Sequence, residues 1–276
     1  MRAPVLPPVM MLRSPRILPR KSLGQNFLRD PNIAEKIVAA IHPRAGDVVL
    51  EIGPGEGALT RGLAAAGSAL IVVDVDPRVI AAMRALFPGG NVEIRQGDFL
   101  DVDLPALAAD RTTRLRVVGN IPYNITSPIL FHVLDHRHAV ADFTIMVQKE
   151  VALRMTAPPG SSDYGILSVM CGWCAETTRL FDVSPNAFFP RPKVTSTVVS
   201  LRMRERPSAP VNDERFFRAM VRSVFGKRRK TLRNSLSYFA EAEGFAVPPL
   251  PGLKRRPEEL SIPDLAELSN LLWQSR

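Results

Sequence analysis

The stretch Asn120-Ile121-Pro122-Tyr123 combines groups that can hold and activate an aromatic amine. The nitrogen of such an amine is a poor nucleophile because its lone pair is conjugated into the ring. The side-chain oxygen of Asn120 can accept one of its N–H groups, and the carbonyl of Ile121, held extended before a proline, can accept the other. Two acceptors would strengthen the nitrogen as a nucleophile while Tyr123 stacks on the ring. The alternative interpretation is an ordinary proline turn.

A second group of residues can hold a nucleotide-like ligand. The loop Gly53-Pro54-Gly55-Glu56-Gly57 follows the apolar run 48–52, and glycines let the backbone turn tightly and approach a ligand closely. Asp74 ends the next apolar run, ~20 residues further on, where an acid can grip a ribose hydroxyl. Asp98 follows the third apolar run and suits an adenine amino group.

Two alternatives compete with this interpretation. The glycine loop also fits G-x-G-x-x-A, the dinucleotide fingerprint, so a nicotinamide or flavin oxidoreductase is a second possible class. Pro54, which stiffens the loop, and Asp98, which supplies the extra acid, count against it. Helix capping is the competing role for the aspartates. We assign that role to Asp76, because it precedes Pro77 at an expected helix start, and keep Asp74 and Asp98 as ligand residues.

The elements that must position these residues alternate between strand and helix. Apolar runs predict strands over 48–52, 69–75, 92–96, 115–118 and 143–148, with helices over 58–66 and from residue 77 onward. This alternation indicates an α/β fold with a doubly wound, largely parallel sheet. Ligands of such sheets bind beyond the carboxyl ends of the strands, where the residues above are expected to meet.

A small helical region is expected after a linker at 206–210. Helical periodicity covers 213–239, and 261–273 is predicted to be a last helix. The chain of 276 residues carries a net charge of +9, which favours a polyanionic partner. Much of the charge is concentrated in one run, where consecutive cations would repel one another on a plain solvated face. The run consists of Lys227, Arg228, Arg229, Lys230 and, further on, Arg233.

The remaining features exclude several classes of protein. No apolar run approaches the ~20 residues that cross a bilayer, so we expect a cytoplasmic protein without a membrane partner. Cys171 and Cys174 cannot complete a four-ligand zinc site alone, so we predict core packing and no metal. Residues 1–20 contain five prolines and no acid, which predicts a basic, disordered arm rather than a secretory signal. Met10 and Met11 are alternative starting residues within it.

Four motifs, taken in order, resemble the ribosomal RNA adenine dimethyltransferase family. Residues 120–123 are similar to the N-[ILP]-P-[YF] motif of amino-methylating nucleic-acid methyltransferases. Residues 21–28 resemble the family's N-terminal motif, and residues 188–196 resemble its second target-site motif. Residues 227–234 resemble the basic helix of the small-subunit (16S) rRNA branch. The resemblance covers everything except the first twenty residues.

The resemblance implies a fold, a cofactor and a set of roles. It implies a class I (Rossmann-like) methyltransferase domain over 21–206 and a helical RNA-binding domain over 207–276. The cofactor would be S-adenosylmethionine, and the basic run of the second domain would contact RNA. The residues implied to contact the cofactor are Asn26, Leu28, Gly53, Asp74, Asp98 and Asn120. The implied catalytic residues are Asn120, Tyr123 and Phe188, the two aromatics stacking on opposite faces of a flipped adenine.

One position departs from the family's pattern. The ribose-binding acid is usually glutamate, and Asp74 is one methylene shorter. We therefore expect a ribose contact that is longer or passes through water, with the cofactor unchanged.

The resemblance also implies a substrate. It is the exocyclic amino nitrogen of two adjacent adenosines near the 3′ end of small-subunit (16S) rRNA, in an assembling ribosomal subunit and modified by a monomer. Residues 123–128 and 225–234 favour this branch over the one that modifies large-subunit (23S) rRNA and confers macrolide resistance. A fold retained only as an RNA-binding assembly or transcription factor is a further alternative, against which the intact 120–123 motif argues.

Overall fold

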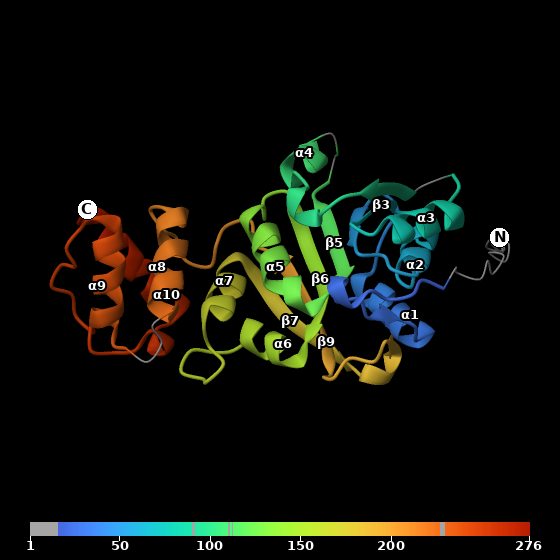
Figure 1. Cartoon of the computed structure of the whole chain (residues 1–276). Helices are drawn as coiled ribbons and strands as arrows, with labels where there is room; N and C mark the ends of the chain where they lie inside the picture. The colour runs from blue at the N-terminus through green and yellow to red at the C-terminus, as the bar shows by residue number, and fades with distance from the viewer. Residues whose placement is uncertain (1–15, 90–91, 110, 112, 227–229) are drawn as a thin grey trace, which may run out of the picture.

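A mixed sheet forms the centre of the larger lobe (Figure 1). The computed structural model describes residues 16–89, 92–109, 111, 113–226 and 230–276. Within them the strand order is β4-β3-β2-β5-β6-β9-β7, parallel from β4 to β6 and antiparallel from β6 through β9 to β7. The doubly wound, largely parallel sheet is confirmed. Its strands are β2 (Val48–Ile52), β3 (Ala69–Asp74), β4 (Val92–Gln96), β5 (Leu115–Asn120), β6 (Val140–Gln148), β7 (Ala175–Val183) and β9 (Ser196–Met203).

Helices cover both faces of the sheet. In β2, Leu50 and Ile52 pack into one apolar core and Val49 into the other, because successive side chains of a strand point to opposite faces. The face of Val49 is covered by α1 (Pro31–Ile41), α2 (Thr60–Ala65) and α3 (Pro77–Leu86). The other face is covered by α4 (Leu104–Ala109), α5 (Thr126–Asp135), α6 (Lys149–Met155) and α7 (Ile166–Cys174). Among the described residues, no helix combines the length and apolarity needed to cross a membrane.

A second, two-stranded ribbon lies beside the large sheet. It pairs β1 (Phe27–Leu28) with β8 (Phe188–Phe189) in antiparallel register. Phe27 lies opposite Phe189, and Leu28 lies opposite Phe188. The ribbon therefore joins the N-terminal motif to the second target-site motif, which are far apart in the sequence.

The segment before the ribbon packs on the body of the protein. Ile17 is buried, and its backbone N–H donates to Glu56 Oε1 at 3.2 Å. Arg78 Nη1 donates to the carbonyl oxygen of Leu18 at 2.9 Å. The disorder that we expected for residues 16–20 is therefore wrong, because apolar burial and these bonds offset the entropy of ordering them. Residues 1–15 of the expected arm lie outside the described residues.

The C-terminal lobe is helical, as expected, but its first helix is shorter than predicted. The helix predicted over 213–239 is two helices, α8 (Glu214–Gly226) and α9 (Leu232–Glu243), followed by α10 (Ile262–Gln274). The break is shown by Thr231, the N-cap of α9, whose backbone is extended. Lys230 lies in a bend between the helices and Arg233 in the first turn of α9. The expectation of one continuous basic helix is therefore wrong.

The two lobes share an apolar core. Trp173 of α7 lies 4.8 Å from Phe217 of α8, centroid to centroid, and its Nε1 donates to the carbonyl oxygen of Ala209 at 2.8 Å. The guanidinium of Arg137, only 3% exposed, pairs with Glu214 at 2.5 Å. Apolar residues from α5, α7, α8, α9 and α10 belong to one continuous cluster, so the C-terminal lobe is fixed to the sheet.

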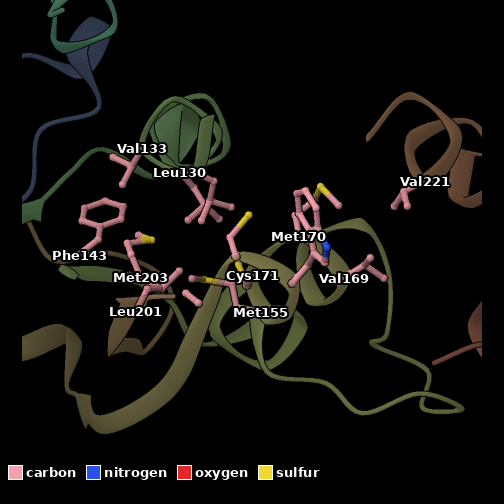
Figure 2. Close-up of a cluster of buried hydrophobic side chains, with 14 of the residues drawn as sticks. Leu130, Val133, Phe143, Met155, Val169, Met170, Cys171, Leu201, Met203 and Val221 are labelled. Carbon is pink, nitrogen blue, oxygen red and sulfur yellow. The ribbon is translucent and has the colours of Figure 1, made fainter. Parts of the chain in front are cut away.

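Both cysteines lie in this cluster, as predicted. Cys171 packs among Leu130, Met155 and Met203 (Figure 2). Cys174 is equally buried, and burial raises the pKa of its thiol to about 11. Such a thiol is protonated at neutral pH and behaves as a small apolar side chain.

Candidate functional site

A cavity of about 420 Å³ lies at the carboxyl ends of β2, β3 and β5, within the range of small-molecule sites. β3 and β5 flank β2 on opposite sides, so the cavity occupies the switch point at which doubly wound sheets bind ligands. It brings together most of the site residues that the sequence predicts. Those that line it are Asn26, Leu28, Gly53, Asp74, Asp98, Asn120 and Tyr123.

The glycine loop forms the floor between β2 and β3. Gly53 has a φ of +65°, and its N–H donates to the carbonyl oxygen of Val73 at 2.9 Å. Gly55 has a φ of +56°, and a Cβ added there would lie 2.8 Å from Phe27 Cδ1. Both positions therefore require glycine, the first for its backbone conformation and the second also for space.

The two aspartates predicted to bind a ligand, Asp74 and Asp98, each retain acceptor capacity. Asp74 Oδ1 accepts the N–H of Asp76 at 2.8 Å, and burial raises the pKa of Asp74 to about 6. Asp98 is exposed, and its Oδ1 caps the short helix Phe99–Asp101 by accepting the N–H of Leu100 at 2.9 Å. A carboxylate offers about four lone-pair sites, so a local cap and a ligand contact can coexist at both positions.

Asp76 has the capping role that the sequence predicts. It is the N-cap of α3, with Pro77 as the first helical residue, and its Oδ1 accepts the N–H of Arg78 at 3.0 Å. Gln25 Nε2 also donates to Oδ2 at 3.0 Å. The Arg78 guanidinium lowers the pKa of Asp76 to about 2, so this carboxylate stays ionised and fastens the N-terminal segment beside the cavity.

Asn120 is oriented by a hydrogen bond at the end of β5. Its Nδ2 donates to the backbone carbonyl oxygen of Asn26 at 3.2 Å. The bond fixes the amide plane and leaves Oδ1 as the acceptor. The side chain is therefore arranged as the predicted amine-binding role requires.

Tyr123 is anchored through its hydroxyl. The hydroxyl forms a 2.6 Å hydrogen bond with Ser196 Oγ at the start of β9. Burial raises the pKa of Tyr123 above its usual value, so the phenol is neutral at physiological pH. With its hydroxyl held, the ring lines the cavity as a fixed apolar surface.

Phe188 is not brought into the cavity. It is 5% exposed, belongs to the apolar cluster that also contains residues of α1 and α3, and is absent from the residues that line the cavity. Its strand partner Leu28 does line the cavity, and directly opposed residues lie ~5 Å apart between their Cβ atoms. The stacking role of Phe188 stays a prediction.

Glu51 lines the cavity but was not assigned a role from the sequence. It is 2% exposed, the Thr60 hydroxyl lies beside its carboxyl group and favours the ionised form, and its Oε2 makes no hydrogen bond within 3.5 Å to the described residues. Burial raises the pKa of Glu51 to about 8, and the nearby Asp74 carboxylate adds to the rise. The available signal was an acid inside the otherwise apolar run 48–52, since glutamate is almost never fully buried unless paired.

The described part of the basic run lies away from the cavity. Lys230 and Arg233 are both exposed, and neither lines the cavity. Lys227, Arg228 and Arg229 lie outside the described residues. The placement separates the phosphate contacts predicted for this run from the amine-binding role predicted for Asn120.

Comparison with known proteins gives a consistent result. A family model described as ribosomal RNA adenine dimethylase matches residues 18–247. A ribosomal RNA small subunit methyltransferase A from Xanthomonas axonopodis pv. citri is 49% identical over 254 residues, 91% of this chain and 95% of that protein. The protein of the same name from Aromatoleum aromaticum is 45% identical over 254 residues, 92% and 94% of the two chains.

Solved structures show the same fold. A dimethyladenosine transferase from Plasmodium falciparum superposes with a TM-score of 0.72 at 28% identity, over 88% of this chain and 95% of that chain. The 23S rRNA methyltransferase ErmE superposes with a TM-score of 0.64 at 29% identity, over 88% and 98%. The match extends over both lobes, since each superposition covers most of both chains.

Proposed function

Because this chain belongs to the ribosomal RNA adenine dimethylase family, we propose that it dimethylates the exocyclic amino nitrogen of two adjacent adenosines near the 3′ end of small-subunit (16S) rRNA. S-adenosylmethionine is the proposed methyl donor. The reaction would belong to the assembly of the small ribosomal subunit in the cytoplasm. The protein would act as a monomer whose partner is the rRNA of the assembling subunit.

The orientation of Asn120 is the observation that carries the proposal. Its nitrogen is engaged by the carbonyl of Asn26 at 3.2 Å, so its oxygen can accept an N–H of adenine. The carbonyl of Ile121, which precedes Pro122, supplies the second acceptor. Two acceptors draw the amine toward tetrahedral geometry, and the acceleration comes from orienting the reactants and from fixed dipoles aimed at the transition state.

The residues that line the cavity support S-adenosylmethionine as the cofactor. Asp74 suits the ribose hydroxyls and Asp98 the adenine amino group, as the resemblance implied. Glu51 adds a buried carboxyl group, whose ionised form a cationic ligand would favour. When bound, the cofactor supplies a methyl group on a positively charged sulfur. A protein base is not required, because the methylated nitrogen is acidic enough to release its proton to solvent.

Two features favour small-subunit rRNA as the substrate. The relatives that are 45–49% identical carry the name ribosomal RNA small subunit methyltransferase A, whereas the 23S rRNA methyltransferase is 29% identical. The exposed cations Lys230 and Arg233 fit phosphate anchoring by the region 207–276, which we propose as the RNA-binding domain. The region 21–206 is then the methyltransferase domain.

The test is labelled methyl transfer to three acceptors in parallel. Wild-type protein and radiolabelled S-adenosylmethionine are incubated with unmethylated small subunits, large subunits and DNA, and dimethyladenosine is mapped in the product. We expect modification of small subunits alone, abolished in Asn120→Ala and retained in Asn32→Ala, an exposed asparagine of α1. Label confined to large subunits would assign the macrolide-resistance activity, and binding to small subunits without methyl transfer would assign an assembly factor.

A further inference from the structure

Phe189 is a large aromatic side chain that is left half exposed. It exposes 46% of its surface, while Phe188 beside it is buried. The guanidinium of Arg29 lies over its ring, 4.2 Å from the centroid. Because Arg29 covers one face of the ring, the exposed area belongs to the opposite face and the edge. A flat π surface is therefore presented to the outside.

This surface is held rigidly at the rim of the cavity. Arg29 makes two hydrogen bonds to the carboxylate of Glu56, Nε to Oε2 at 3.0 Å and Nη2 to Oε1 at 2.9 Å. Glu56 belongs to the glycine loop and lines the cavity. Phe189 itself lies opposite Phe27, which also lines the cavity. The ring, the guanidinium and the cofactor loop thus form one connected unit.

Cations follow Phe189 along the chain. Arg191 and Lys193 are exposed, and neither forms an ion pair within the part of the chain that the structure describes. The segment ends at Ser196, whose hydroxyl bonds that of Tyr123 at 2.6 Å. Residues 189–195 therefore run from one wall of the cavity to the side chain that we assign to the target base.

We propose that residues 189–193 bind the unpaired RNA strand that flanks the target adenine, an inference that rests on the proposed function. Phe189 stacks on a neighbouring nucleobase, and Arg191 and Lys193 contact its phosphates. An aromatic platform beside unpaired cations is the usual arrangement for single-stranded nucleic acid, and RNA is recognised mainly through such unstacked bases. Arg29 orients the platform through Glu56 and contributes its own cation–π contact.

Measuring the affinity for a short RNA distinguishes the contribution of the Phe189 ring from that of the two cations. The probe is a fluorescein-labelled adenosine hexaribonucleotide, followed by anisotropy at several salt concentrations. Losing the stacked base in Phe189→Ala should weaken binding ~5-fold or more, with an unchanged salt slope because the ring carries no charge. Phe189→Trp should bind as well as wild type. Replacing Arg191 and Lys193 by alanine should instead reduce the slope of log affinity against log salt by ~1.4, or ~0.7 for each phosphate.

Two controls keep the test specific. Leu271→Ala removes a comparably exposed apolar side chain, 40% exposed, on α10, and should leave RNA binding unchanged. Calorimetry with S-adenosylmethionine should give the wild-type affinity in Phe189→Trp, which shows that the cavity wall is intact. Phe189→Leu keeps the apolar surface without the π face and should bind as weakly as the alanine variant.

Several outcomes would overturn the inference. The proposal is wrong if the wild type shows no detectable binding of the hexamer. It is equally wrong if Phe189→Ala or Phe189→Leu binds within twofold of wild type, or if the salt slope is unchanged without Arg191 and Lys193. These results leave the proposed function untouched if small subunits are still methylated. Conversely, weakened hexamer binding together with methyl transfer only to large subunits would refute the proposed substrate and leave an RNA site at Phe189.

Discussion

Replacing Glu51 by glutamine should stabilise the protein in the absence of ligand. Burial raises the pKa of Glu51 to about 8, against 4.5 for an ordinary glutamate. Between these values the folded chain keeps a proton that the unfolded chain releases, so folding stability falls as pH rises through this window. Each pH unit in this window lowers the free energy of unfolding by ~1.4 kcal/mol, so the loss at pH 7 is on the order of 3 kcal/mol. Glutamine has nearly the same shape and never ionises.

The measurement is urea unfolding followed by circular dichroism at pH 5, 6, 7 and 8, without cofactor. Glu51→Gln should exceed wild type by on the order of 3 kcal/mol at pH 7, or roughly 6–12 °C in Tm, and by little near pH 5. Glu35→Gln, at an exposed site on α1, should match wild type throughout. A variant whose stability runs parallel to wild type across this range, or lies below it at pH 7, would show that Glu51 is ionised in the folded protein.

Three further predictions concern the cavity and the basic run. Asp98→Ala should weaken S-adenosylmethionine binding by ~1–3 kcal/mol in calorimetry, while NAD binds neither protein; tight NAD binding would revive the oxidoreductase alternative. Asn120→Ala should fold yet lose ~10²–10³ in the single-turnover rate with little change in RNA affinity, and a near-normal rate would mean that the base is held otherwise. Replacing both Lys230 and Arg233 by alanine should reduce the slope of log subunit affinity against log salt by ~0.7–0.9 per lost phosphate contact, without altering cofactor affinity. An unaltered slope would mean that these cations are only solvated and do not contact RNA.

The sequence was most informative where strands end. Buried parallel strands are continuous apolar runs, so the ends of β2, β3 and β5 could be located, and with them Gly53, Asp74 and Asn120. The ribbon of β1 and β8 could not be found in this way, because two residues have no periodicity. The burial of Ile17 was missed for a related reason, since a lone apolar residue among prolines carries no pattern.

Other features depend on tertiary contacts that a sequence does not display. An acid inside the apolar run 48–52 marks Glu51 as unusual, but its burial and its raised pKa follow only from the sheet that encloses it. The break before Leu232 was hidden because the helical periodicity of the sequence continues on both sides of it. Phe188 was assigned through a motif, and a motif cannot say that the side chain rests in the core rather than in the cavity.

The core shared by α7 and α8 makes the distance between the two lobes a fixed length. A flexible tether would supply only an effective concentration, and any RNA within its reach would qualify. Here Trp173 and the ion pair of the buried Arg137 with Glu214 hold the lobes together. An RNA held at Lys230 and Arg233 could present to Asn120 only an adenine at one separation from those phosphates. The protein would then methylate only rRNA in which the adenine and the anchored phosphates lie at that separation. It would not act on an assembly state in which this separation has not yet formed or has already changed.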